Sequence, residues 1–402
     1  MKFVGRCNYD QKIIQFFDNF SPENEYVIWG CGNAFRIIYN DIGSVLKIKY
    51  CVDANTKLQG TTLYGNQIVA PEYLFRNDKK NIKILMTPVG YKMMSICETL
   101  IDNGFDEGNF CSAFDWLTLY KYHYQNILSL QEITLVCTTL CTLNCKGCCA
   151  YVPYHKRNRH FDLKTIIHDI DSFFSVVDFV SVITLGTGEV LLYPHIIDVL
   201  NYIYENYKGR YGDILIITNA THVPKPDIME TLQRVDCHIK ISEYESIGSR
   251  CKIHKLSNAF ERYHIDYHTE KLFGTETEIG GLWSDLGDPS ISHNKTEEEK
   301  ALTFENCAVC SRFLHNGRLF YCTPQCGATM GGLYNPQEDE CIDFTKPVQK
   351  IDILKYHLGI QPSGYIPFCD RCDGLGIVAN PKTIAAGQQL RKKDNDVEAI
   401  YG

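Results

Sequence analysis

Residues 137–149 read CTTLCTLNCKGCC and place five cysteines in thirteen positions. Three of them, Cys141, Cys145 and Cys148, have the spacing C-x3-C-x2-C. Three thiolates from one short loop can bind three irons of a cubane iron–sulfur cluster and leave the fourth iron open to another ligand. Structural zinc prefers paired C-x2-C motifs in a closed set of four, so the x3 gap fits zinc poorly. Cys137 and Cys149 lie outside the spacing, and we expect them to be bystanders.

The whole chain has 402 residues, 45% hydrophobic residues and a net charge of -8, which is typical of a globular protein with two or three domains. Its N-terminal segment, MKFVGRCNYDQK, lacks a continuous apolar run, so we expect a cytoplasmic protein with no signal peptide and no membrane partner. Binding to phosphates needs clustered Lys and Arg, and the sequence shows no large cluster of them. We therefore expect no nucleic-acid partner.

The other cysteines form a second group and a scatter. Because reducing cytosol keeps thiols free, nineteen cysteines in such a chain favour metal or cluster binding over disulfides. The second group lies in FENCAVC, YCTPQC and FCDRC, between Cys307 and Cys372. The scattered cysteines are interpreted as small buried apolar residues: Cys7, Cys31, Cys51, Cys97, Cys111, Cys237, Cys251 and Cys341.

Residues 1–112 are predicted to form a small α/β domain. A strand EYVIWG, a turn CGN, a helix AFRIIYNDI and a second strand VLKIKYCVD follow one another, and a hairpin and the strand NIKILMTPVG extend the pattern. The stretch DWLTLYKYHYQNIL has aromatic residues at helical spacing and predicts a helical linker over 113–130.

From residue 131 the sequence repeats strand then helix, with strands at ITLVC, FVSVITLG, DILIITNA, HIKIS and YHIDYH. This alternation predicts an α/β core with a parallel sheet over 131–290, open or curled toward a barrel. Active sites of such sheets gather at the carboxyl ends of the strands, and the cysteine loop directly follows the first strand. The loop-rich remainder, 291–402, contains the second cysteine group.

The C-x3-C-x2-C loop in this position resembles the radical S-adenosylmethionine (SAM) superfamily. The segment GTGEVLLYP, 186–194, is similar to that superfamily's G-G-E-P element, with Gly188 and Glu189 matching and Thr187 and Val190 departing from it. The resemblance implies that Gly188 and Glu189 hold the methionine amino group of SAM. It also implies a partial (β/α)6 TIM-like barrel as the core.

Two further positions agree with the resemblance, and one departs from it. ITNAT resembles the family's T-N-G segment, which makes Asn219 a SAM contact, and Ser242 in KISEY stands where such enzymes touch the ribose. The residue before the third cysteine is usually aromatic in the family, whereas this chain has Gly147. That departure weakens an adenine-stacking role at this position and leaves the cluster prediction intact.

The resemblance implies a 4Fe-4S cluster and SAM as cofactors, and a one-electron donor such as flavodoxin or ferredoxin as a partner. Reductive cleavage of SAM would give methionine and a 5'-deoxyadenosyl radical that removes hydrogen from an unactivated C–H bond.

The second cysteine group resembles the twitch and SPASM extensions of radical SAM enzymes. The stretch from Cys307 through Gly317 to Cys322 has the form C-x9-G-x4-C, and FCDRC supplies one late pair. The shorter set is similar to the twitch form with one auxiliary 4Fe-4S cluster, as in cyclitol dehydrogenases. The candidates for its four ligands are Cys307, Cys310, Cys322, Cys369 and Cys372, with Cys307 or Cys310 as alternatives for one position and Cys326 as the spare. A zinc ribbon built from two C-x2-C pairs is the alternative.

The N-terminal IWGCGNAF is a fragment of a dinucleotide-binding motif. Gly30 and Gly32 fit its first two glycines, Phe35 stands where the third belongs, and Asp53 lies where an acidic residue meets a ribose hydroxyl. The region resembles Rossmann-like domains attached to nucleotide-sugar-modifying enzymes. We therefore expect a nucleotide-sugar or scaffold role; a domain that only packs is the alternative.

Three functions remain open at this point. The first is a radical SAM oxidoreductase acting on a carbohydrate-like or nucleotide-sugar small molecule, with LWSDLGD (Trp283, Asp285 and Asp288) lining its cavity. The second is a radical SAM peptide maturase. The third is a non-catalytic iron–sulfur or zinc protein that binds a partner or relays electrons.

Overall fold

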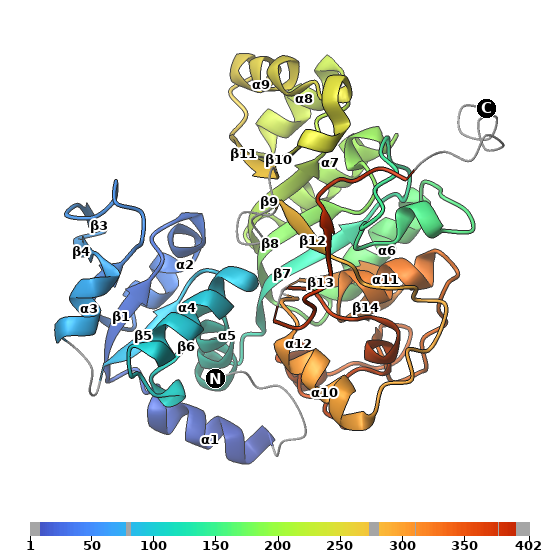
Figure 1. Ribbon diagram of the computed structural model, residues 1–402. Helices are drawn as coiled ribbons and strands as arrows, with labels where there is room; N and C mark the ends of the chain where they lie inside the picture. The colour runs from blue at the N-terminus through green and yellow to red at the C-terminus, as the bar shows by residue number, and fades with distance from the viewer. Residues whose placement is uncertain (1–8, 78–81, 273–280, 310, 377, 391–402) are drawn as a thin grey trace.

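The computed structural model describes residues 9–77, 82–272, 281–309, 311–376 and 378–390. Figure 1 shows an N-terminal α/β unit on one side, a central sheet, and a C-terminal unit rich in loops and short helices on the other. The cysteine loop follows the central sheet's first strand in the chain.

The N-terminal sheet has the order β3-β4-β2-β1-β5-β6 among the described residues. All neighbouring pairs are parallel except β3 and β4, which form a hairpin. The strands are β1 Glu25–Trp29, β2 Lys47–Val52, β3 Thr62–Leu63, β4 Asn66–Val69, β5 Lys83–Met86 and β6 Phe110–Ser112. The helices are α1 Tyr9–Asn19, α2 Asn33–Gly43, α3 Pro71–Asn77, α4 Tyr91–Asp102 and α5 Ala113–Gln125.

The side of the sheet to which successive strands are added reverses at β1. The connection through α2 places β2 on one side of β1, whereas β5 and β6 lie on the other side. In open α/β sheets a ligand crevice lies at such a switch point, outside the carboxyl ends of the strands. The loops that follow β1 and β5 meet there.

The central sheet has the order β11-β10-β9-β8-β7-β13-β14-β15 over the described ranges. Neighbouring strands are parallel from β11 to β13, and β14 and β15 are antiparallel to their neighbours. Its strands are β7 Ser129–Val136, β8 Phe179–Gly186, β9 Tyr211–Thr218, β10 His238–Tyr244, β11 Tyr267–Leu272, β13 Arg312–His315, β14 Arg318–Phe320 and β15 Ile342–Asp343. The sheet therefore continues past residue 290, the predicted end of the core.

Amphipathic helices cover this sheet. In α7 the buried residues Ile196, Val199, Leu200 and Ile203 recur at helical spacing, so one apolar stripe packs against the strands. The helices are α6 Leu163–Phe174, α7 Ile196–Tyr207, α8 Pro226–Arg234 and α9 Ile253–Arg262. The side chain of Asp162 caps α6 by accepting a hydrogen bond from the backbone N–H of Thr165.

A tight turn joins β13 to β14. Asn316 and Gly317 have φ values of 50° and 73°, and this pair of left-handed residues is typical of a two-residue hairpin turn. The buried carboxylate of Asp169 in α6 accepts hydrogen bonds from the backbone N–H groups of Asn316 and Gly317. Gly317 of the C-x9-G-x4-C stretch is thus a turn residue that fixes the C-terminal unit to the core.

The C-terminal unit contains α10 Glu297–Asn306, α11 Thr323–Met330 and α12 Lys350–His357. Two short strands, β12 Leu282–Ser284 and β16 Thr383–Ala385, pair antiparallel and form a separate sheet. The 3-10 helices of the described chain are Glu107–Asn109, Val152–Tyr154, Val190–Leu192, Glu245–Arg250 and Pro367–Arg371.

Most predicted elements are confirmed, and one is misplaced. The predicted fifth core strand, YHIDYH, covers 263–268, whereas β11 spans Tyr267–Leu272. Residues after α9 first make a turn in which His264 has a φ of 54°, so the strand begins later. The mixed α/β class with parallel sheets is confirmed; the domain boundaries stay predictions. Among the described residues, no helix has both the length and the apolar character needed to cross a membrane.

Two buried histidines predict an acid-sensitive fold. Burial, with a smaller contribution from Arg159, lowers the pKa of His315 to about 4, and burial followed by Arg312 lowers that of His357 to about 3. Because these folded-state values lie below the unfolded value of about 6.5, the unfolded chain binds more protons as pH falls. We expect the free energy of unfolding to fall by up to about 1.4 kcal/mol per pH unit per histidine between about pH 6.5 and 4. Urea denaturation at several pH values measures this slope. It should become shallower in His315→Phe, and an unchanged slope would contradict the assignment.

Candidate functional site

The cysteine loop begins where β7 ends. Its first part is held by residues 159 and 160: Thr138 forms an isolated antiparallel bridge with His160, and the N–H of Thr139 donates to the carbonyl of Arg159 at 3.0 Å. The loop therefore starts from a fixed position at the carboxyl end of the sheet.

Cys141, Cys145 and Cys148 lie together. They pack in one apolar cluster with Leu143, Tyr244, Ile247, Cys251 and Trp283. Cys137 is fully buried in the main core, as a bystander would be, while Cys149 is exposed. Cys251, which we predicted to be a structural cysteine, lies in the same cluster as the three loop cysteines.

The G-T-G-E turn after β8 packs directly on the cysteine loop. Gly188 has a φ of 57°, and a Cβ there would stand 2.4 Å from the carbonyl oxygen of Leu140. Thr187 also has a positive φ, 69°, which is unusual for a β-branched residue. Its hydroxyl donates to the carbonyl of Thr138 at 3.0 Å. Both residues have the left-handed backbone conformation that glycine adopts most easily, and at residue 187 this chain places a threonine in that conformation.

The carboxylate of Glu189 is buried and oriented. It accepts hydrogen bonds from the hydroxyl of Thr218 and the backbone N–H of Asn219, both at 2.9 Å. Burial raises the pKa of Glu189 to about 7. The Asn219 amide in turn donates to the Sγ of Cys141 at 3.5 Å. Predicted residues from the ends of β8 and β9 thus converge on the cysteine loop.

A cavity of about 450 Å³ opens beside the loop. Gly147 and Cys149 form one wall, and Ser242, the predicted ribose contact, forms part of another. Residues of α4 also border it: Met94, Ser95 and Glu98. A volume of this size is typical of small-molecule sites.

Trp283 occupies the space beside Gly147. A Cβ on Gly147 would meet the Ile384 side chain at 2.2 Å and the Trp283 ring at 3.3 Å. Trp283 also packs edge-on against Tyr244, with ring centroids 5.4 Å apart. The side chains of Ile384 on β16 and Trp283 on β12 therefore fill the space beside Gly147, with Ile384 the closer of the two. Trp283 lines the cavity as predicted, whereas Asp285 and Asp288 of the same stretch are not among its lining residues.

An ion pair in this cavity was not predicted from the sequence. Lys240 on β10 and Glu270 on β11 bind each other and both line the cavity. Lys240 and Ser242 are two residues apart and share a face of β10, because side chains alternate along a strand. In the sequence, the alternation of polar and apolar residues in HIKIS, 238–242, indicates that Lys240 and Ser242 lie on the same face of the strand. The predicted fifth strand, 263–268, ends before Glu270, which lies in β11.

Comparison with known families agrees with this geometry. Residues 135–242 match the family model described as Radical SAM superfamily. The chain carries a radical SAM domain. The cofactors of this superfamily, and therefore of this domain, are a 4Fe-4S cluster and S-adenosylmethionine. A comparison with curated proteins found no match.

Several solved structures resemble parts of the chain. It is similar to anSMEcpe with bound AdoMet at 13% identity, with a TM-score of 0.28, over 35% of this chain and 42% of that one. It is similar to BtrN in complex with AdoMet and 2-DOIA at 15% identity, with a TM-score of 0.38, over 61% of this chain and 93% of that one. Similarity to Streptococcus suis SuiB bound to S-adenosylmethionine has 18% identity and a TM-score of 0.29, over 46% of this chain and 39% of that one. The chain thus spans less than half the length of anSMEcpe.

Outside the radical SAM domain, four cysteines of the second group line one small apolar cavity: Cys307, Cys322, Cys369 and Cys372. Backbone N–H groups of Leu375 and Gly374 donate to the Sγ atoms of Cys307 and Cys372, at 3.3 and 3.4 Å. Burial raises the pKa of Cys322 and Cys369 well above the usual thiol value, and that of Cys372 to about 12. Metal binding here would therefore release protons.

The remaining cysteines of this group differ. Cys310 lies outside the described residues. Cys326 is fully buried in a separate apolar cluster with Cys341 and Phe313. Among the residues that the structure describes, no three His, Cys, Asp or Glu side chains form a group suited to one metal ion. In a cubane cluster each thiolate binds a different iron.

Tyr151 connects the two cysteine regions. It follows the cysteine loop, and its backbone N–H donates to the carbonyl of Cys148 at 2.8 Å. Burial, followed by the neighbouring thiols Cys372 and Cys322, raises the pKa of its hydroxyl. The cavity lined by the four cysteines therefore lies close to the cysteine loop of the radical SAM domain.

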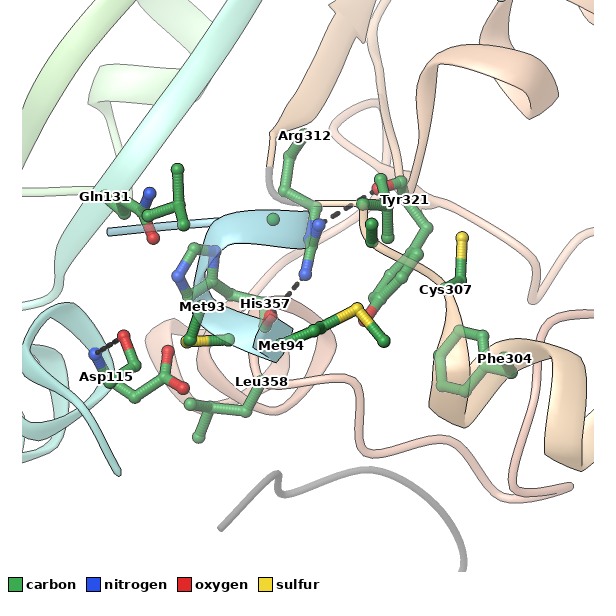
Figure 2. A pocket seen from close by; sticks show the side chains of 15 residues that line it. Met93, Met94, Asp115, Gln131, Phe304, Cys307, Arg312, Tyr321, His357 and Leu358 are labelled. Carbon is green, nitrogen blue, oxygen red and sulfur yellow. Dashed lines mark hydrogen bonds between the residues drawn. The ribbon is translucent and has the colours of Figure 1, made fainter. Parts of the chain in front are cut away.

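Figure 2 shows a further cavity, of about 90 Å³, between α4 and the C-terminal unit. The guanidinium of Arg312 lies 3.8 Å from the Tyr321 ring centroid and donates to the carbonyl oxygens of Tyr321 and His357. Cys307 lines both this cavity and the four-cysteine cavity. A fixed positive charge therefore stands near the second cysteine group.

The N-terminal candidates have structural partners. Gly30 has a φ of 106°, and a Cβ there would stand 2.5 Å from the hydroxyl of Thr87, which follows β5. Gly32 precedes α2 with open space around it. The carboxylate of Asp53 accepts hydrogen bonds from the N–H groups of Cys31 and Asn55, both at 2.8 Å. A nucleotide role for these residues remains a prediction.

Proposed function

We propose that this protein is a radical SAM enzyme that abstracts hydrogen from a carbohydrate-like or nucleotide-sugar small molecule. The observation that carries the proposal is the cavity of about 450 Å³ that joins the cysteine loop to the Lys240–Glu270 pair. The cofactors supply the radical, and the chain supplies binding, orientation and exclusion of water.

The ligands of the cluster are proposed to be Cys141, Cys145 and Cys148. Their side chains pack in one apolar cluster beside the cavity, which fits a group held by three thiolates and open on one side. With the cluster and SAM bound, these groups would supply a 5'-deoxyadenosyl radical by reductive cleavage of SAM.

SAM is proposed to lie between the G-T-G-E turn and Ser242. Glu189, held by Thr218 and Asn219, would face the ammonium group of the methionine moiety, and that positive charge would favour its ionised form. Trp283 and Tyr244 offer aromatic surfaces for the adenine in place of a side chain at residue 147. Ser242 offers a hydroxyl to the ribose.

A polar small molecule suits the rest of the cavity. Lys240 and Glu270 provide paired donors and acceptors on one wall, and Ser284 and Glu98 add more on others. Hydroxyl and amino groups on a ring are recognised by such convergent polar side chains in an otherwise apolar pocket. The α4 border supports a role for the N-terminal unit in binding or covering the substrate, including a nucleotide sugar.

A second 4Fe-4S cluster is proposed in the four-cysteine cavity, with Cys307, Cys322, Cys369 and Cys372 as ligands. Its proximity to Cys148 through Tyr151 supports electron transfer from the substrate radical, which would make the reaction a net oxidation. An external donor such as flavodoxin or ferredoxin would supply the initiating electron.

Removing this second site gives a clear expected result. The double variant Cys369→Ala/Cys372→Ala should lose about four of about eight irons per chain after anaerobic reconstitution. Cys326→Ala, a matched buried cysteine of the same unit, should keep them. Iron, zinc and sulfide analysis measures the difference. About one zinc in the wild type, lost only in the double variant, would replace this proposal with a structural zinc site.

The substrate class is tested by hydrogen transfer. Reduced enzyme and SAM are incubated with cyclitols, aminocyclitols and nucleotide sugars deuterated on their ring carbons, and 5'-deoxyadenosine is analysed by mass spectrometry. We expect deuterium in 5'-deoxyadenosine with at least one of them. That transfer should weaken at least tenfold in Lys240→Met and persist in Lys271→Met, an exposed neighbour of the pair. Transfer from peptides alone would favour the peptide maturase instead.

A further inference from the structure

The end of the described chain returns to the cysteine loop. After β16, residues 388–390 lie antiparallel to residues 144–146, with a bridge between Gln389 and Cys145. The N–H of Lys146 donates to the carbonyl of Gln388 at 2.7 Å, and the N–H of Leu390 donates to that of Asn144 at 2.8 Å. We call residues 386–390 the C-terminal strap.

The strap is fixed before it reaches the loop. Gly387 has a φ of 67°, and a Cβ there would stand 2.8 Å from the Oγ of Ser246 and from the Tyr244 ring. The hydroxyl of Ser246 donates to the carbonyl of Gly387 at 2.6 Å. This close approach leaves the following residues a defined direction across the loop.

The Gln389 side chain is oriented at both ends of its amide. Its Oε1 accepts from the backbone N–H of Asn144 at 2.9 Å, and its Nε2 donates to the Sγ of Cys145 at 3.1 Å and to the carbonyl of Gly387 at 2.6 Å. A flipped amide would face N–H to N–H and oxygen to oxygen, so hydrogen-bond complementarity assigns the Nε2 to the sulfur. Cys145 itself is buried, which shields this bond from water.

We propose that Gln389 is a positioning residue of the radical SAM cluster, which holds the Cys145 thiolate and raises the reduction potential of the cluster. This inference rests on the proposed assignment of Cys145 as a cluster ligand. Hydrogen bonds to the sulfurs are among the factors that set the potential of an iron–sulfur cluster. A donor on a ligand sulfur stabilises the reduced cluster, which carries one more negative charge. By raising this potential, the strap favours transfer of the initiating electron from the external donor to the cluster.

Three variants test this role. Gln389→Leu removes all three side-chain hydrogen bonds at similar size. Gln389→Glu keeps an oxygen for the Asn144 N–H and replaces the donor with a negative charge. Gln388→Leu is the matched control. The side chain of Gln388 is exposed, and this residue binds the loop through its backbone carbonyl, which the substitution keeps. Each full-length protein is reconstituted anaerobically, and its iron content is measured first.

The readout is the midpoint potential from a redox titration followed by electron paramagnetic resonance. The loop cluster is identified as the signal that changes on adding SAM. We expect Gln389→Leu to lower the equilibrium constant for its reduction about tenfold, a shift of about 59 mV to more negative potential. Gln389→Glu should shift further in the same direction, and Gln388→Leu should match the wild type.

Potentials in Gln389→Leu and Gln389→Glu equal to that of the wild type would overturn the inference. So would a Gln389→Glu protein that retains its cluster at the wild-type potential while Gln389→Leu loses iron, because the role would then be structural alone. Failure of the proposed function looks different. In that case the wild type has no SAM-responsive signal, and no variant of Gln389 changes that.

Discussion

Replacing Cys141, Cys145 and Cys148 together with alanine should remove about four of about eight irons per reconstituted chain and abolish SAM cleavage. The three thiols pack in one cluster beside the cavity, and Cys149, which follows Cys148 in the sequence, lies outside their spacing. Iron and sulfide analysis with product detection by mass spectrometry measures both effects. Cys149→Ala, which leaves the C-x3-C-x2-C set intact, is the matched control and should keep both properties. Unchanged iron in the triple variant would show that the loop binds no cluster.

Gly188→Ala should disable SAM binding through the backbone alone. Its Cβ would stand 2.4 Å from the carbonyl oxygen of Leu140 and 3.0 Å from that of Thr138, at a φ of 57°. Left-handed backbone costs about 1–2 kcal/mol for a residue with a Cβ, and the contact must also be relieved. The turn would move away from the cysteine loop and carry Glu189 with it.

We expect at least about tenfold weaker SAM binding in Gly188→Ala, equivalent to about 1.4 kcal/mol. Equilibrium dialysis with the reconstituted protein measures this affinity. Gly209→Ala is the matched control, since Gly209 also has a positive φ, 89°, but a Cβ there would meet no atom of the described residues within 4 Å beyond its chain neighbours. It should lose some stability and keep its SAM affinity. Equal affinities in the two variants would contradict the proposed position of SAM.

Local patterns predicted much of this site. The spacing of Cys141, Cys145 and Cys148 is a local pattern, and so is the alternation that predicted the strands before Gly188 and Asn219. The resemblance to the radical SAM superfamily then singled out Gly188 and Asn219 at these strand ends. Parallel strands then bring their carboxyl ends to one edge, so residues distant in sequence could be placed together before the structure was known. The predicted helix AFRIIYNDI agrees with α2 for the same reason.

The rest depends on contacts between distant segments. Strand β13 pairs with β7 across more than 170 residues, and Gln389 reaches Cys145 across 244. No periodicity encodes such pairing. Ile384 and Trp283 fill the space beside Gly147 because β12 pairs with β16, a match of two three-residue strands that carries almost no sequence signal. The Lys240–Glu270 pair was not predicted, because the predicted fifth strand ends at His268, before Glu270.

Reductive cleavage of SAM by the reconstituted wild-type protein is the decisive measurement. Under anaerobic conditions with dithionite and SAM, we predict 5'-deoxyadenosine and methionine in equal amounts, formed only with the reductant and absent from the triple cysteine variant. An intact loop cluster that yields no 5'-deoxyadenosine under these conditions would contradict the proposed function and favour a non-catalytic iron–sulfur protein.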